Sequence, residues 1–206
     1  MRKKFYCDVT IIGAWNKSII NPIWLKEQFP SLFKDSDIKS ELKIGSSLTF
    51  RHTIDNVSIE VMDDRILFIT EFEQKKNLKF IADLSLFICE KLPHTPILAI
   101  GHNFIYTPRN TLKGIEKLLN NEQQEQLIQK FNSGYHIENQ FHFSFAEHKK
   151  ILKIILINNK KERYINVSFN YHYLIQSNED IRNALNEFIK NYHDSKQKLI
   201  NLENNK

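Results

Sequence analysis

The chain has 206 residues, of which 41% are hydrophobic and 12% aromatic, and its formal net charge is +5. This composition excludes an intrinsically disordered chain and indicates a single domain with a sizeable core. No stretch approaches the roughly 18 uncharged apolar residues of a membrane span, so we expect no membrane partner. The positive charge permits an anionic partner such as nucleic acid, but a solvated surface explains 29 basic and 24 acidic residues equally well.

The two cysteines, Cys7 and Cys89, both lie in apolar runs. We therefore expect two reduced core thiols, as in a cytoplasmic protein. The basic residues 2–4 resemble the start of a signal peptide, but Asp8 interrupts the apolar run that follows and no small-residue cleavage site is present. The sequence thus predicts a cytoplasmic protein.

The first half of the chain begins with residues 5–15, which are rich in β-branched and aromatic side chains and predict a strand. Asn21 followed by Pro22 predicts a helix start, with Asn as the N-cap. Residues 42–72 alternate between apolar and polar around two acidic turns, which predicts an antiparallel meander with one polar face. Residues 73–92 predict a long buried helix.

The second half repeats this order of elements. Residues 96–106 predict a strand, and the spacing of apolar residues over 111–131 predicts a helix. A second antiparallel meander is predicted over 135–147, 151–157 and 164–175. Ser177 has the character of a helix N-cap, and an apolar stripe follows it as far as Tyr192.

Both halves therefore read as β-α-β-β-β-α pseudo-repeats, and Gly13 and Gly101 occupy comparable places 88 residues apart. We expect an α+β fold: a single domain over 1–206 with two pseudo-repeat lobes, 5–92 and 95–195. One antiparallel sheet would carry the helices on one face, and residues 196–206 would form a frayed polar tail. This topology resembles the saddle of TATA-binding-protein-like folds and, more loosely, helix-grip folds. The resemblance rests on topology alone, so no functional residue is transferred from it.

Motifs for catalysis and cofactors are missing from the sequence. There is no His-Glu-x-x-His metal motif, no Gly-x-Ser-x-Gly elbow and no glycine-rich phosphate loop. We therefore expect no metal and no cofactor. An enzyme would need a site assembled from scattered residues.

The most informative pattern is an uncharged polar series in the second meander. Over residues 164–173, apolar and aromatic side chains alternate with asparagine, serine and histidine, and residues 140–145 do the same. The aromatic set should meet the helices, and the polar set should face away from them. We predict binding residues at His142, Ser144, Asn166, Ser168, Asn170 and His172. Thr49, Arg51 and Thr53 would extend this surface in the first half.

Uncharged hydrogen-bonding side chains suit a partner, because no net charge has to be desolvated on binding. We therefore expect a non-catalytic adaptor that holds a protein partner on its sheet face or a sheet edge, within a complex. An ordinary solvated polar face is the alternative explanation, and a homodimer is also open. A second hypothesis is a nucleic-acid binder with a basic rim of Lys149, Lys150, Lys160 and Lys161. An enzyme with a dispersed site is the third.

Overall fold

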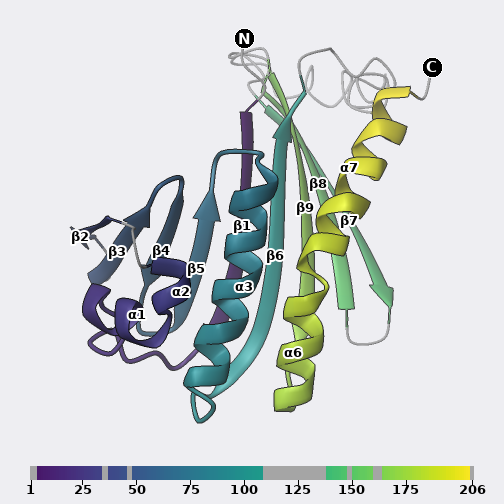
Figure 1. Cartoon of the computed structure of the whole chain (residues 1–206). Helices are drawn as coiled ribbons and strands as arrows, with labels where there is room; N and C mark the ends of the chain where they lie inside the picture. The colour runs from purple at the N-terminus through teal and green to yellow at the C-terminus, as the bar shows by residue number, and fades with distance from the viewer. Residues whose placement is uncertain are drawn as a thin grey trace.

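The computed structural model describes residues 4–33, 37–45, 48–108, 138–147, 150–159 and 164–204. The predicted helix at 111–131 lies outside these residues. The α+β prediction is confirmed, because the described residues form one nine-stranded antiparallel sheet and five helices. The strand order is β2-β3-β4-β5-β1-β6-β9-β8-β7 (Figure 1).

The first half has the predicted strand, helical region, antiparallel meander and long helix, but the meander contains four strands where three were predicted. Its elements are β1 (Lys4–Gly13), α1 (Pro22–Gln28), α2 (Pro30–Phe33), β2 (Ile38–Ile44), β3 (Leu48–Ile54), β4 (Val57–Val61), β5 (Arg65–Thr70) and α3 (Lys75–Lys91). The Asn21 side chain caps α1 by accepting hydrogen bonds from the amides of Ile23 and Trp24. Pro30 begins α2, so the single predicted helix is two short ones.

The described elements of the second half are strands and two consecutive helices. They are β6 (Ile97–Thr107), β7 (Glu138–Glu147), β8 (Lys150–Asn159), β9 (Tyr164–Leu174), α6 (Asn178–Asn186) and α7 (Phe188–Asn204). Ser177 caps α6, as expected, by accepting from the Asp180 amide. The expected polar tail differs from the structure, because α7 continues to Asn204 and buries Leu199 against the core.

The two central strands, β1 and β6, pair along almost their whole length. Asp8 lies opposite Asn103 and Val9 opposite His102, and the register shifts between Ile12 and Gly13. A side chain at Gly13 would not fit, since a Cβ there would lie 2.4 Å from the Pro96 carbonyl oxygen. The centre of the sheet is therefore formed by two strands from the two halves of the chain.

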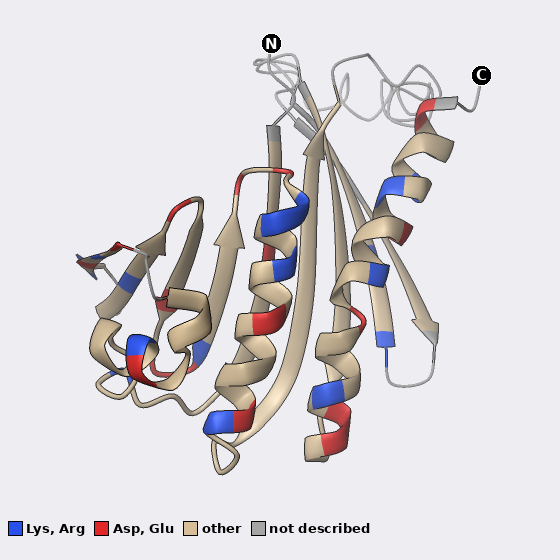
Figure 2. Cartoon of the chain, in the orientation of Figure 1, with Lys and Arg blue, Asp and Glu red and all other residues tan. Residues whose placement is uncertain are grey.

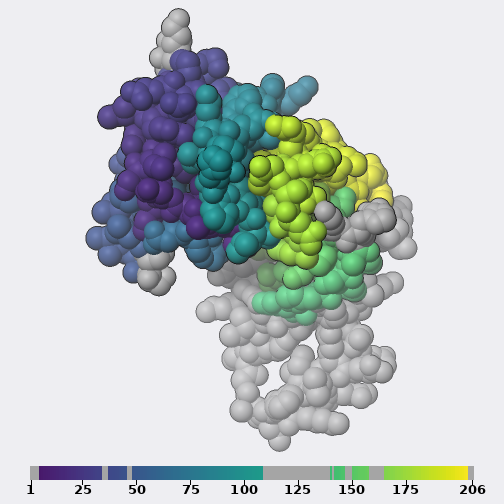
Figure 3. All heavy atoms as spheres, turned by 90° about the horizontal axis from the view of Figure 1, so that it is seen from below, coloured from purple at the N-terminus to yellow at the C-terminus, as the bar shows by residue number. Residues whose placement is uncertain are grey.

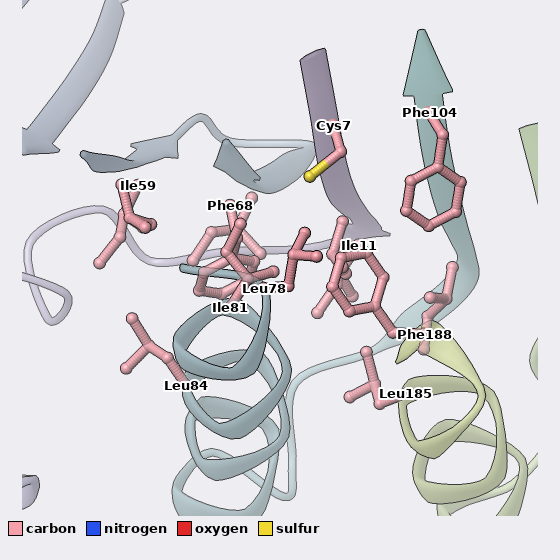
Figure 4. Close-up of a cluster of buried hydrophobic side chains, with 14 of the residues drawn as sticks. Cys7, Ile11, Ile59, Phe68, Leu78, Ile81, Leu84, Phe104, Leu185 and Phe188 are labelled. Atoms are coloured by element: carbon pink, nitrogen blue, oxygen red, sulfur yellow. The ribbon is translucent and has the colours of Figure 1, made fainter. Parts of the chain in front are cut away.

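All five helices lie on one side of the sheet (Figure 1). Seen from below, α1 and α2, then α3, then α6 follow one another in a row, and α3 packs against α6 (Figure 3). Alternate residues of the central strands point into this layer and form the core with the helices. The core includes Cys7, Ile11, Ile59, Phe68, Leu78, Ile81, Leu84, Phe104, Leu185 and Phe188 (Figure 4).

Candidate functional site

The sheet face that points away from the helices is called the open face here. On β9, Val167, Phe169 and Tyr171 are buried in the core beneath the helices. Successive residues of a strand point to opposite sides, so Asn166, Ser168, Asn170 and His172 lie on the open face. Each of these four side chains is half-buried among its neighbours on this face.

The register joins the predicted residues of β7 to those of β9 through β8. Ser144 lies opposite Lys153, which lies opposite Asn170 on its other side. In the next row His142 lies opposite Ile155, and Ile155 opposite Ser168. The six predicted binding residues therefore occupy one face, with His142 and Ser144 exposed near its edge.

A chain of hydrogen bonds continues this surface across the centre of the sheet. Asn170 Nδ2 donates to Asn103 Oδ1, and Asn103 Nδ2 donates to Asp8 Oδ1 at 2.7 Å. Thr10 Oγ1 also donates to Asp8 Oδ1, at 2.6 Å. Burial raises the pKa of the Asp8 carboxyl, which is only 4% exposed, and the hydrogen bonds from Thr10, Asn103 and Tyr6 oppose this effect. The alternation of residues 5–11 in the sequence could have predicted that Asp8 lies on this face. It could not have predicted which residues of another strand bond to it.

His172 and Gly101 meet beside this chain of hydrogen bonds. They are opposite each other in the β6–β9 register. A Cβ at Gly101 would lie 3.7 Å from Asn170 Nδ2 and 3.8 Å from Asn103 Nδ2, which is ordinary contact. Burial, and then the nearby charge of Lys153, lower the pKa of His172, so the neutral imidazole is favoured. At neutral pH His172 is therefore an uncharged hydrogen-bonding group on this face.

Sequence reasoning missed the apolar part of the open face. Strand parity also places Leu67, Ile69, Ile105, Ile151, Ile155 and Ile157 on it, each of them half-buried. Apart from Lys153, residues 151–157 of β8 are apolar on both faces, so the sequence shows no alternation there. The open face from β5 to β8 is therefore mostly a mixture of aliphatic and uncharged polar side chains, with Asp8, Arg65 and Lys153 as charged exceptions.

The flank formed by β2, β3 and β4 is charged, and several of its charges are paired with one another. Thr49, Arg51 and Thr53 lie on the open face, as expected. Arg51 Nε lies 3.6 Å from Glu41 and 3.7 Å from Glu60, and Lys43 Nζ lies 2.8 Å from Glu60. This flank therefore differs in character from the centre of the face.

Phe143 and Phe145 of β7 are not buried beneath the helices as predicted. Phe143 is 42% and Phe145 56% exposed. Helix α7 packs against β6 and β9, and these two side chains of β7 remain largely exposed. A groove of about 910 Å³ lies between α7 and this part of the sheet, with Phe145, Leu152 and Ile154 among its lining residues.

Of the four predicted rim lysines, only Lys150 lies in the described residues. It is on the helix side of the sheet, where its Nζ lies 3.5 Å from Glu187 and 6.0 Å from the centre of the Tyr171 ring. Lys150 therefore does not border the open face. In the view from the helix side, charged residues lie both on the helices and on the turns between strands (Figure 2).

A buried polar cluster lies behind the open face, between β6, β9 and α7. The Asn191 amide donates to His102 Nδ1 at 2.9 Å and to Tyr173 Oη at 2.6 Å. Burial lowers the pKa of His102 to about 3, so its ring is neutral. Nδ1 accepts a hydrogen bond, so the ring proton is on Nε2, which has no partner among the described residues.

Among the described residues, no group of three or more His, Cys, Asp or Glu side chains is placed to hold a metal ion. Burial raises the pKa of the Cys7 thiol and raises that of Cys89 to about 12, so neither is a ready nucleophile. Within the described segments no helix has the length and apolar character needed to cross a bilayer.

No family model matches the chain. No curated protein matches it significantly.

Proposed function

We propose that this chain is a binding protein that holds a protein partner on the open face of its sheet. One observation carries the proposal: the strand register gathers uncharged polar and half-buried aliphatic side chains on the face that the helices leave free. Protein interfaces combine such apolar contacts with neutral hydrogen-bonding groups and contain few charges at their centre. The adaptor hypothesis therefore fits this face better than an ordinary solvated surface does.

The charges on the face support a protein partner rather than nucleic acid. From β5 to β7, the charged open-face residues with described side chains are Asp8, Arg65 and Lys153. Asp8 is buried, and Arg65 is paired with Asp64 at 2.6 Å. Phosphate binding usually relies on several exposed basic groups. Nucleic acid is therefore the second hypothesis, to be decided by the same experiment.

The strand order also supports the two pseudo-repeats. Around the central β1–β6 pair, β5 and β4 follow on one side as β9 and β8 follow on the other. Each half would then supply one part of a saddle-shaped open face. We infer a cytoplasmic protein from the buried free thiols of Cys7 and Cys89.

Affinity purification of the tagged protein from its source cells tests the proposal, at low and moderate salt and with and without nuclease. Ser168→Arg places a charge at the centre of the open face, and Ser31→Arg makes the same change on exposed α2. We expect a stoichiometric protein that survives nuclease, is lost with Ser168→Arg and is retained with Ser31→Arg.

Other results of this purification would contradict the proposal. Retention of the protein partner by a folded Ser168→Arg variant would exclude the open face as the binding surface. Nucleic acid that co-purifies at low salt and is lost at moderate salt would favour the second hypothesis.

A further inference from the structure

Strand β2 forms one end of the sheet, and no described strand pairs with its outer edge (Figure 1). An unpaired edge presents a row of backbone donors and acceptors to another strand. Residues 39–44 are all exposed, and on the helix side of the strand Leu42 is 50% and Ile44 84% exposed. This edge therefore offers both backbone hydrogen bonds and apolar contact area.

The charges on β2 alternate in sign along the open face. Asp37 precedes the strand, and Lys39, Glu41 and Lys43 follow at every second residue. Edges that only avoid pairing are commonly protected by lysines, proline or a bulge. A regular alternation of sign is instead complementary to an antiparallel copy of itself.

We propose that β2 pairs antiparallel with β2 of a second copy of this chain, about a two-fold axis at Ser40. In this arrangement a residue a given number of positions before Ser40 lies opposite the residue the same number of positions after Ser40 in the other copy. Lys39 lies opposite Glu41 of the other copy, Lys43 opposite Asp37, and Ile38 opposite Leu42. Each pairing occurs twice because of the symmetry, and all charged pairs are attractive.

Neighbouring registers are less favourable. An axis at Glu41 would place Glu41 opposite itself and Lys39 opposite Lys43. An axis at Lys39 would place Lys39 opposite itself and Asp37 opposite Glu41. Both arrangements put like charges opposite each other, which destabilises a strand pair. An axis at Leu42 would keep only the Glu41–Lys43 pairing, and an axis at Ile38 only the Asp37–Lys39 pairing. The axis at Ser40 therefore gives the largest number of attractive pairs.

Two of the four charges that would pair across the dimer make no ion pair within the described part of their own chain. Asp37 and Lys39 are exposed, and neither makes an ion pair with the described residues. Glu41 and Lys43 already lie near Arg51 and Glu60 of the adjacent strands. A second copy would therefore extend an existing charge network rather than break it. The two open faces would become one continuous surface.

Analytical ultracentrifugation of charge-swapped variants tests this arrangement. Lys39→Glu and Glu41→Lys each convert two attractive pairs into like-charge pairs, so each should weaken the dimer by about tenfold or more. An equimolar mixture of the two variants should form a heterodimer, because the introduced glutamate of one variant then faces the introduced lysine of the other. The double variant Lys39→Glu/Glu41→Lys should form a homodimer again.

Disulfide trapping tests the register independently. Ser40→Cys should form a covalent dimer under mild oxidation, because the two copies of this position lie opposite each other. Lys39→Cys should form far less, since position 39 faces 41. The native Cys7 and Cys89 are buried and should not contribute. A wild-type protein that stays monomeric at high micromolar concentration would overturn the proposal. So would a dimer whose affinity is unchanged in both the Lys39→Glu and the Glu41→Lys variant.

Discussion

The side-chain amide of Asn103 donates a hydrogen bond to the Asp8 carboxylate at 2.7 Å, across 95 residues of sequence. The two residues are also direct partners in the β1–β6 register. Their contact joins the two halves of the chain at the centre of the open face. Asp8 is thus an acidic residue whose neighbours on this face are mostly uncharged.

Replacement of Asp8 by asparagine should stabilise the protein at neutral pH. Burial raises the pKa of Asp8, so its stabilising contribution is present in acid and is lost as the pH rises from 3.8 through the higher folded value. Asparagine keeps an acceptor for Thr10 and Asn103 without the buried charge. We expect the free energy of unfolding at neutral pH, measured by urea denaturation, to rise in the Asp8→Asn variant.

This gain should shrink as the pH is lowered toward 3.8, where the carboxyl also becomes neutral in the unfolded chain. Glu27→Gln on exposed α1 is the matched control and should change little. Loss of stability in Asp8→Asn at neutral pH would show that the charged carboxylate is stabilised by its hydrogen bonds.

The buried His102 should make the protein sensitive to acid. Burial lowers its pKa from 6.5 to about 3, because charging the ring costs solvation that Glu187 only partly offsets. Between these values the unfolded chain binds a proton that the folded protein excludes. As the pH is lowered through this window, the free energy of unfolding should therefore decrease, by up to about 1.4 kcal/mol per pH unit.

The His102→Gln variant can still accept a hydrogen bond from Asn191 and does not titrate. Its free energy of unfolding should depend less steeply on pH than that of the wild type. His94→Gln, at an exposed position, should keep the wild-type slope. Equal slopes for His102→Gln and the wild type would exclude His102 as the cause.

The two glycines at comparable places in the sequence should respond oppositely to alanine. At Gly13 a Cβ would lie 2.4 Å from the Pro96 carbonyl oxygen, which also accepts a hydrogen bond from Ala14. This backbone cannot move freely, so Gly13→Ala should cost about 2 kcal/mol. Gly101→Ala makes only ordinary contacts and should gain about 0.5–1 kcal/mol. Thermal and urea unfolding would measure both, and a destabilised Gly101→Ala would contradict the geometry.

Phe188 should be one of the most sensitive positions in the core. Its ring is fully buried and stacks on Phe104 with centroids 5.5 Å apart (Figure 4). Phe188→Ala should cost about 3–5 kcal/mol. Phe145→Ala, the matched control on exposed β7, should cost about 0.5 kcal/mol or less. A large loss at Phe145 would indicate that this side chain is covered in solution.

The sequence predicted those features that depend on neighbours along the chain. The alternation on β9 placed Asn170 and His172 on one face, and Asn21 with Pro22 predicted the start of α1. Features set by distant segments were not predictable in this way. The link from Asn103 to Asp8 depends on the pairing of two strands far apart in sequence. The exposure of Phe145 depends on the path of α7, which strand periodicity does not encode.

The position of β1 has a consequence for synthesis on the ribosome. One edge of β1 pairs with β5, but its other edge can pair only after β6 has been made, and β6 follows α3 in the chain. A nascent chain that has completed the N-terminal half therefore exposes a long apolar strand edge at what becomes the middle of the sheet. Nonlocal pairing of this kind slows folding and favours aggregation of partly made chains. Truncation before Ile97 should thus yield an insoluble fragment rather than an independent half-domain.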